Sequence, residues 1–208
     1  MKRARTIPVA AVGLAAALAL AACGHPRDTT SHGTGHTSPR STASSAGSGI
    51  HDAADTMFAQ MMIPHHRQAL EMAELAATRA ADPKVAELAA KIETEQEPEI
   101  RTMTAWLAAW GEPVPDVSGG MNHGAMGHGA MPGMMGDADL AKLRAAGGTA
   151  FDRMFLQMMI DHHTGAVQMA RTELAQGKSA EAKTLAKAIV ATQTAEIAEM
   201  HHLLTTLD

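Results

Sequence analysis

The segment Phe58-Ala59-Gln60-Met61-Met62-Ile63-Pro64-His65-His66 decides the fold, because it returns as Phe155-Leu156-Gln157-Met158-Met159-Ile160-Asp161-His162-His163. The match extends without a gap from residues 55–107 to residues 152–204, at a constant offset of 97 residues and with 20 identities in 53 aligned positions. Such a match indicates an internal duplication, so one structural unit is expected to occur twice.

Each copy has the pattern of a helical hairpin. Residues of the inward stripe recur at intervals of three and four, from Phe58 through His65 to Met72, and again from Leu88 to Leu107. Asp82 before Pro83, and Ser179 in the second copy, are typical helix starts. Four long amphipathic helices predict an all-α four-helix bundle made of two hairpins. A short extra helix is expected before the third long helix, over residues 137–146.

The N-terminus predicts export and anchoring. Basic residues at positions 2, 3 and 5 precede an apolar run over residues 7–20, which leads into the chain's only cysteine, Cys23. This run is too short for a spanning helix and resembles a lipoprotein signal peptide over residues 1–22. We expect diacylated Cys23 to hold the protein on the cell membrane, facing the periplasm or the exterior. The alternative is an uncut signal peptide followed by an incidental cysteine.

Composition divides the remaining chain. Residues 23–49 are rich in Ser, Thr, Gly and His and are expected to form a flexible tether. Residues 50–208 form the expected bundle domain, with hairpins over 51–110 and 137–208 and a Met/His-rich loop over 111–136. Three of the 17 basic residues lie in the signal peptide, and the remaining 14 against 22 acidic residues give a net charge of −8. This balance disfavours nucleic-acid binding.

Polar residues recur on the inward stripes, where a packing stripe would repeat apolar ones. They are His65 and His162, Gln96 and Gln193, and Glu99 and Glu196. Burying such groups without a partner costs roughly 2 kcal/mol or more. His65 lies sixteen residues before the expected turn near Ala81 and Glu99 eighteen after it, so their heights differ by only about 3 Å. One layer of each hairpin can therefore collect imidazole, carboxylate and thioether groups.

These repeated side chains are candidate metal ligands. The primary set is Met62, His65, His66, Met72, Glu99, Met103, Met159, His162, His163, Met169, Glu196 and Met200. Adjacent histidines diverge by about 100° on a helix, so we favour His65 and His162 as ligands and expect His66 and His163 in a second site or a supporting hydrogen bond. Secondary collectors are Met61, Met158, Met121, His123, Met126, His128, Met131, Met134 and Met135. Taken singly, Met57, Met154 and Met169 are expected to be core fillers.

The donor types indicate the metal. Thioethers bind Cu(I) and Ag(I) well and zinc, magnesium or calcium poorly, whereas imidazole accepts both oxidation states of copper. A thioether also needs no deprotonation and persists outside the cytoplasm. We therefore expect copper, and also silver, as the bound metal, without a catalytic residue. No thiolate remains once Cys23 is acylated.

The motif Met158-Met159-x-x-His162-His163-x-Gly165-Ala166-x-x-Met169-Ala170, with Gln193-x-x-Glu196 downstream, resembles the family catalogued as domain of unknown function 305. The resemblance covers residue 50 to the C-terminus. It implies a ferritin-like helical bundle, commonly exported, whose better-understood relatives bind copper or silver and assist metal tolerance. The matching positions are the Met and His residues named above.

Three functions follow from these patterns. The first is lipid-anchored copper capture or buffering, with copper-handling envelope proteins as partners. The second is a ferritin-like metal oxidase or reductase, although only Glu199-x-x-His202 has the di-iron spacing and its counterpart is Thr102-x-x-Ala105. The third is a metal-free helical module that docks another envelope protein.

Overall fold

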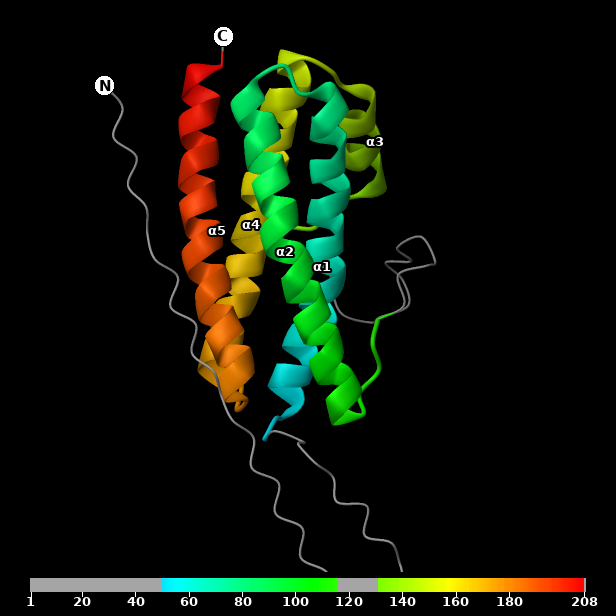
Figure 1. Cartoon of the computed structure of the whole chain (residues 1–208), viewed down its shortest axis with the longest axis vertical. Helices are drawn as coiled ribbons and strands as arrows, with labels where there is room; N and C mark the ends of the chain where they lie inside the picture. The colour runs from blue at the N-terminus through cyan, green and yellow to red at the C-terminus, as the bar shows by residue number, and fades with distance from the viewer. Residues whose placement is uncertain (1–49, 116–130, 208) are drawn as a thin grey trace, which may run out of the picture. The chain divides into compact units, whose positions relative to one another are not determined.

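The computed structural model describes residues 50–115 and 131–207 and contains five helices there, without a strand. They are α1 (Ala53–Arg79), α2 (Pro83–Trp110), α3 (Asp137–Ala145), α4 (Thr149–Gln176) and α5 (Ala180–Thr206) (Figure 1). The prediction of an all-α bundle of two helical hairpins with a short extra helix is confirmed. Cys23, the signal peptide and the tether lie outside the described residues.

The helix ends follow from local sequence. Asp52 caps α1 by accepting from the backbone N–H of Ala54 at 2.9 Å, and the Asp55 carboxylate accepts in return from the N–H of Asp52. Asp82 caps α2 ahead of Pro83, whose missing N–H costs nothing at the first helical position. The turns of both hairpins are therefore only a few residues long, which forces each pair of helices to run antiparallel.

Two aspartates lock the hairpins together. The Asp152 carboxylate, at the start of α4, accepts from the backbone N–H groups of Ala81 and Asp82 in the α1–α2 turn. The equivalent Asp55, in α1, accepts from Lys178 and Ser179 in the α4–α5 turn. The start of each hairpin thus lies at the turn of the other, so α1 and α4 pack antiparallel and the two copies are related by a pseudo-twofold axis. The loop length alone leaves this topology open.

The core consists of two apolar clusters. The Phe155 cluster combines the later half of α1, the early half of α2, α3, the start of α4 and the end of α5. The Phe58 cluster combines the opposite halves of α1, α2, α4 and α5. A belt of buried polar residues separates the clusters near the middle of the bundle, and this belt contains the repeated histidines. Burial of apolar surface on both sides holds the belt away from water.

None of the helices within residues 50–115 and 131–207 is long and apolar enough to span a bilayer.

Candidate metal site

Four histidines occupy the middle of the bundle. His65 and His66 come from α1 and His162 and His163 from α4, and each is at most 1% exposed. The rings of His65 and His162 pack against each other with centroids 3.7 Å apart and planes tilted by 37°. The centroids of His162 and His163 are 6.4 Å apart. The antiparallel packing of α1 and α4 therefore brings both histidine pairs to one depth.

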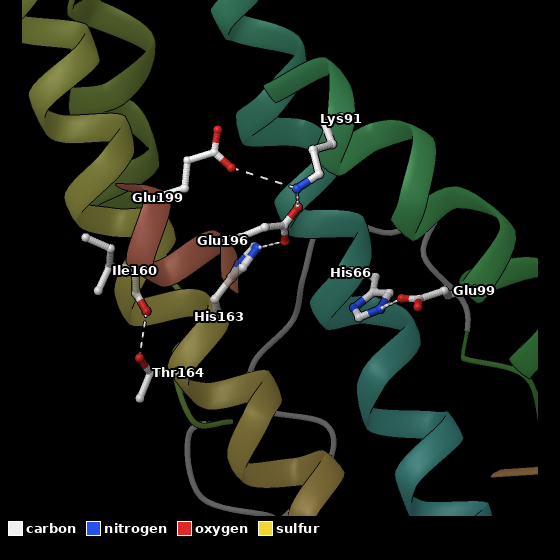
Figure 2. A network of polar contacts seen from close by, with 8 residues as sticks. All are labelled: His66, Lys91, Glu99, Ile160, His163, Thr164, Glu196 and Glu199. Atoms are coloured by element: carbon white, nitrogen blue, oxygen red, sulfur yellow. Dashed lines mark hydrogen bonds and ion pairs between the residues drawn. The ribbon is translucent and has the colours of Figure 1, made fainter. Parts of the chain in front are cut away.

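Each hairpin contributes one histidine–glutamate pair. Nε2 of His66 lies 2.7 Å from Oε2 of Glu99 on α2, and Nε2 of His163 lies 2.9 Å from Oε2 of Glu196 on α5. Figure 2 shows both pairs reaching between the helices of their own hairpins. These histidines, rather than His65 and His162, are the ones that meet the repeated carboxylates.

The hydrogen bonds determine which ring nitrogens remain available. His65 Nε2 lies 3.1 Å from the carbonyl oxygen of Pro132, which only accepts, so this nitrogen carries the proton. His66 and His163 likewise donate from Nε2 to carboxylates. Their Nδ1 atoms, that of His65, and both ring nitrogens of His162 are buried without a hydrogen-bond partner among the described residues. Lone pairs on neutral imidazoles are thus presented inside the bundle.

Burial favours the neutral form of three of these rings, those of His65, His162 and His163. Desolvation, aided by the neighbouring His66, lowers the pKa of His65 to about 3. Desolvation and then the charges of neighbouring histidines place the pKa of His162 well below its usual value of 6.5. Burial also lowers the pKa of His163, although the hydrogen bond to Glu196 opposes this shift. Neutral imidazole is the form that binds metal, so no proton needs to leave these rings at neutral pH.

The two carboxylates have unequal surroundings. Glu196 is 1% exposed, and Nζ of Lys91 on α2 lies 3.5 Å from its Oε1 and 3.8 Å from Oε2 of Glu199 (Figure 2). Burial works to raise the pKa of Glu196, but the hydrogen bond from His163 and further contacts outweigh it and lower that pKa. Burial and contact with Glu196 raise the pKa of Glu95 to about 7. Glu99 is 19% exposed, and the position equivalent to Lys91 in the second copy is Ala188. The two halves of the site are therefore chemically distinct.

Each apolar cluster contains methionines from both hairpins. Met62 and Met103 share the Phe58 cluster with Met169 of the second copy. Met159 and Met200 are the counterparts of Met62 and Met103. They share the Phe155 cluster with Met72 of the first copy. Each of the six is at most 8% exposed. Each cluster beside the histidine belt thus holds three buried thioethers, two from one hairpin and one from the other.

The remaining methionines are less buried. Met61 and Met158 are half-buried at the edges of the two clusters, and Met131, Met134 and Met135 are also half-buried. Met121, His123, Met126 and His128 lie outside the described residues. Met154 packs against the Phe155 cluster as expected of a core filler, but the same expectation is wrong for Met57, which is 49% exposed. Met57 belongs to neither apolar cluster.

Residues 131–135, which we call the strap, cover the histidine belt. Besides the contact of Pro132 with His65, Gln68 donates to the carbonyl of Met135 at 2.9 Å and accepts from its N–H at 2.7 Å. A Cβ on Gly165 would lie 1.9 Å from the Pro132 carbonyl oxygen, and one on Gly133 would lie 2.5 Å from the Asp161 carbonyl oxygen. Gly133 also has a positive φ of 78°. Backbone contact at two glycines therefore seats the strap on α4.

The sequence patterns did not indicate Pro132, Gln68, Gly165 or Lys91 as parts of the site. A signal at Gly165 existed, since an isolated glycine lowers the stability of a helix and often has a packing reason, and Gln68 occupies the equivalent position of the first copy. No comparable signal exists for Lys91, because its contact with Glu196 joins different hairpins.

Within residues 50–115 and 131–207, no group of three or more His, Cys, Asp or Glu side chains is arranged to hold a metal ion. The donors present in the belt are paired imidazoles, with thioethers in the adjoining clusters. Such a set suits an ion that accepts few ligands and tolerates sulfur.

Comparisons with known proteins find a matching family and similar solved structures. The profile of the family described as domain of unknown function 305 (DUF305) matches residues 55–204. A DUF305 fragment from Deinococcus radiodurans is 34% identical over 75% of this chain and 98% of that one, with a TM-score of 0.66. A Streptomyces coelicolor DUF305 protein, proposed to be secreted, is 35% identical over 74% and 93%, with a TM-score of 0.65.

The protein CopM in its Cu(II)-bound form is 37% identical over 73% of this chain and 96% of that one, with a TM-score of 0.62. Structures of CopM with Cu(I) and with silver also match. Comparison with curated protein sequences finds no match.

Proposed function

This chain belongs to the DUF305 family, and on this premise we propose that it binds Cu(I) and Cu(II), and also Ag(I), to capture or buffer them outside the cytoplasm. CopM, a similar protein, has been solved with each of these ions. The ions are cargo in this proposal, and no chemical step is assigned to them.

One observation carries the proposal. Three of the four buried histidines donate Nε2–H to a carbonyl or carboxylate oxygen, which leaves Nδ1 without a partner. Metal-binding histidines commonly donate their second nitrogen in this way, because the bond orients the ring and increases its basicity. Burying a nitrogen without a hydrogen-bond partner costs folding free energy unless a ligand binds to it. A soft metal ion would bind the nitrogen lone pairs that have no hydrogen-bond partner in the belt.

The thioethers favour the reduced ion. Each three-methionine cluster adjoins the belt, so an ion at the histidines has neutral sulfur donors on either side. Cu(I) and Ag(I) accept two or three soft ligands, whereas imidazole nitrogens and Glu99 or Glu196 also suit Cu(II). The same belt can therefore hold both oxidation states of copper.

The location of the protein is part of the proposal. The signal peptide and Cys23 predict a lipid anchor on the cell membrane, with residues 23–49 as the tether. The likeness to a protein proposed to be secreted supports an extracytoplasmic location. Metal ions at the envelope, and copper-handling envelope proteins, are the partners that this placement implies.

The test is a Cu(I) titration of the purified protein against a competing chelator. A double variant, His65→Asn with His162→Asn, removes the central ring pair and should lose binding by at least tenfold. His201→Asn, an exposed histidine on α5, is the matched control and should bind as the unmodified protein does. Failure of the unmodified protein to take Cu(I) from the chelator would overturn the proposal.

The di-iron oxidase alternative gains no support from the geometry. Glu199, which carries the required spacing with His202, has a 48% exposed side chain, and His202 is exposed on the surface of α5. Oxygen consumption after addition of ferrous or cuprous ions would revive it. For a metal-free docking module, added copper should leave the melting temperature unchanged, since only a ligand of the folded state raises it.

A further inference from the structure

A second group of soft donors surrounds a surface hollow at the end of the bundle where α1 begins and α2 ends. The hollow has a volume of about 380 Å³, and its lining includes His51, Asp52, Met57, Met61 and Glu112. Met57 precedes His65 by eight residues, which places it roughly 12 Å further along α1. Neither the four buried histidines nor their glutamate partners line the hollow, so it is distinct from the histidine belt.

Met57 is more exposed than its counterpart in the second copy. It is 49% exposed, whereas its counterpart Met154 is half-buried against the Phe155 cluster. Met57 and Met61 are four residues apart, so they lie on one face of α1 with Cβ atoms about 5–6 Å apart. Two flexible side chains at this spacing can bring their sulfur atoms to one ion.

An imidazole stands at the same hollow in a defined orientation. The ring of His51 stacks on the indole of Trp110, at the end of α2, with centroids 4.5 Å apart and planes within 4°. Trp110 stacks in turn near Trp106, with centroids 6.0 Å apart. An ion bound at His51 would therefore lie beside the indole of Trp110, whose fluorescence it can quench.

The charges around the hollow suit a cation. Asp52 and Glu112 both line it. These groups oppose the positive end of the α1 dipole, which would otherwise repel a cation. Lys178 is the basic group paired here, with Nζ 3.7 Å from Asp52 Oδ2 and a side chain that is 65% exposed.

We propose that His51, Met57 and Met61 form a second, solvent-accessible site for a soft monovalent ion, Cu(I) or Ag(I). The site extends the proposed copper function, but it uses none of the belt residues. The thioethers supply the soft donors, His51 supplies nitrogen, and the carboxylates lower the local potential for a cation.

Ag(I) is the probe, because it is soft and does not change oxidation state during a titration. Addition of Ag(I) to the full chain should quench tryptophan fluorescence. In the variant Met57→Leu with Met61→Leu this response should shift at least tenfold to higher concentration, and one bound equivalent should be lost. The matched control changes the equivalent pair, Met154→Leu with Met158→Leu, and should retain the fluorescence response.

Circular dichroism and thermal melting should show that both double variants remain folded, since leucine conserves the packing of methionine. The His65→Asn with His162→Asn variant separates the two proposals, because it should lose belt binding yet keep the tryptophan response. A fluorescence signal that is insensitive to Ag(I), or a Met57→Leu with Met61→Leu variant that responds as the unmodified protein does, would overturn the second site. Neither result bears on the belt.

Discussion

The imidazole of His65 lies against that of His162, with ring centroids 3.7 Å apart, although 97 residues separate them. They are equivalent residues of the two copies. Two equivalent side chains that touch must lie next to the pseudo-twofold axis, as at the centre of an isologous interface. The glutamate-bound histidines, His66 and His163, flank this pair. The duplication has therefore placed its histidines around one centre rather than at opposite ends of the bundle.

Acid should destabilise the metal-free protein through these rings. Unfolded His65 takes up a proton below about pH 6.5, but burial lowers its folded pKa to about 3. Between these values the unfolded state binds more protons, so the free energy of unfolding falls as pH falls, by about 1.4 kcal/mol per pH unit for each such group. Urea unfolding at pH 7, 5 and 4 measures this slope.

His65→Asn should reduce that slope, and exposed His201→Asn should leave it unchanged. Equal slopes for His65→Asn and the unmodified protein would show that His65 does not have the lowered pKa.

Glu173 should have the opposite effect, because it should lower the free energy of unfolding as the pH rises into the alkaline range. It is 1% exposed, and a Cβ on Gly177 would touch both its Oε1 and Oδ1 of Asp55. Burial, with the adjoining Asp55, raises the pKa of Glu173 to about 8. The folded state then binds the extra proton, so this contribution is complete below about pH 4.5 and is lost as pH rises through 8.

Glu173→Gln imitates the protonated acid and should be more stable than the unmodified protein at pH 9 but similar at pH 5. Thermal melting across this range checks it, with exposed Glu87→Gln as the control. A variant that is destabilised equally at both pH values would contradict a raised pKa.

Gly165→Ala should displace the strap. The new Cβ would lie 1.9 Å from the Pro132 carbonyl oxygen, and backbone on both sides leaves little room to adjust. We expect a loss of roughly 1–3 kcal/mol, typical of overpacking. Amide hydrogen exchange at Met135, whose N–H is held by Gln68, should also accelerate.

Gly147→Ala is the matched control, since nothing lies within 4 Å of its added Cβ. If the strap amides exchange hydrogen as slowly in Gly165→Ala as in the control, the close approach of Pro132 to α4 does not hold the strap in place.

Lys91→Gln should tighten copper binding. Nζ of Lys91 lies 3.5 Å from Oε1 of Glu196, so a metal ion near Glu196 meets a like charge. Like charges roughly 8 Å apart interact by about 2 kcal/mol at an effective dielectric constant near 20, and solvent at the 44% exposed lysine reduces this. We expect a gain of about two- to tenfold.

Chelator competition measures the change, with exposed Lys187→Gln on α5 as the control. Weaker binding in Lys91→Gln would instead indicate that the lysine orients Glu196 for the ion.

Some features of the site were accessible to sequence reasoning because they depend on spacing within one hairpin. The periodic stripe places Glu99 near the height of the histidines, and the structure has the His66–Glu99 pair. The choice between adjacent histidines was not accessible, since it depends on which face each helix turns toward the other hairpin. Helical spacing favoured His65 as a ligand, and in the structure its Nε2 contacts the strap while its Nδ1 has no hydrogen-bond partner among the described residues.

Met72 illustrates the same limit. Met72 was a candidate ligand in the same repeat as Met62, and the structure places it in the cluster of Met159 and Met200. The two methionines are ten residues apart, about 15 Å along α1, so they fall on opposite sides of the belt. Antiparallel packing then gives each of them neighbours from the other copy.

The sequence by itself determined the duplication, the helices, their turns and the inward placement of the repeated histidines, because helical periodicity and capping act over a few residues. Only the tertiary structure decided that α1 packs antiparallel to α4, that His65 meets His162, and that Pro132 covers them. These relationships join residues about 70 to 120 positions apart. They depend on the burial of complementary surfaces and on the exchange of Asp55 and Asp152 between the two turns, which no local pattern records.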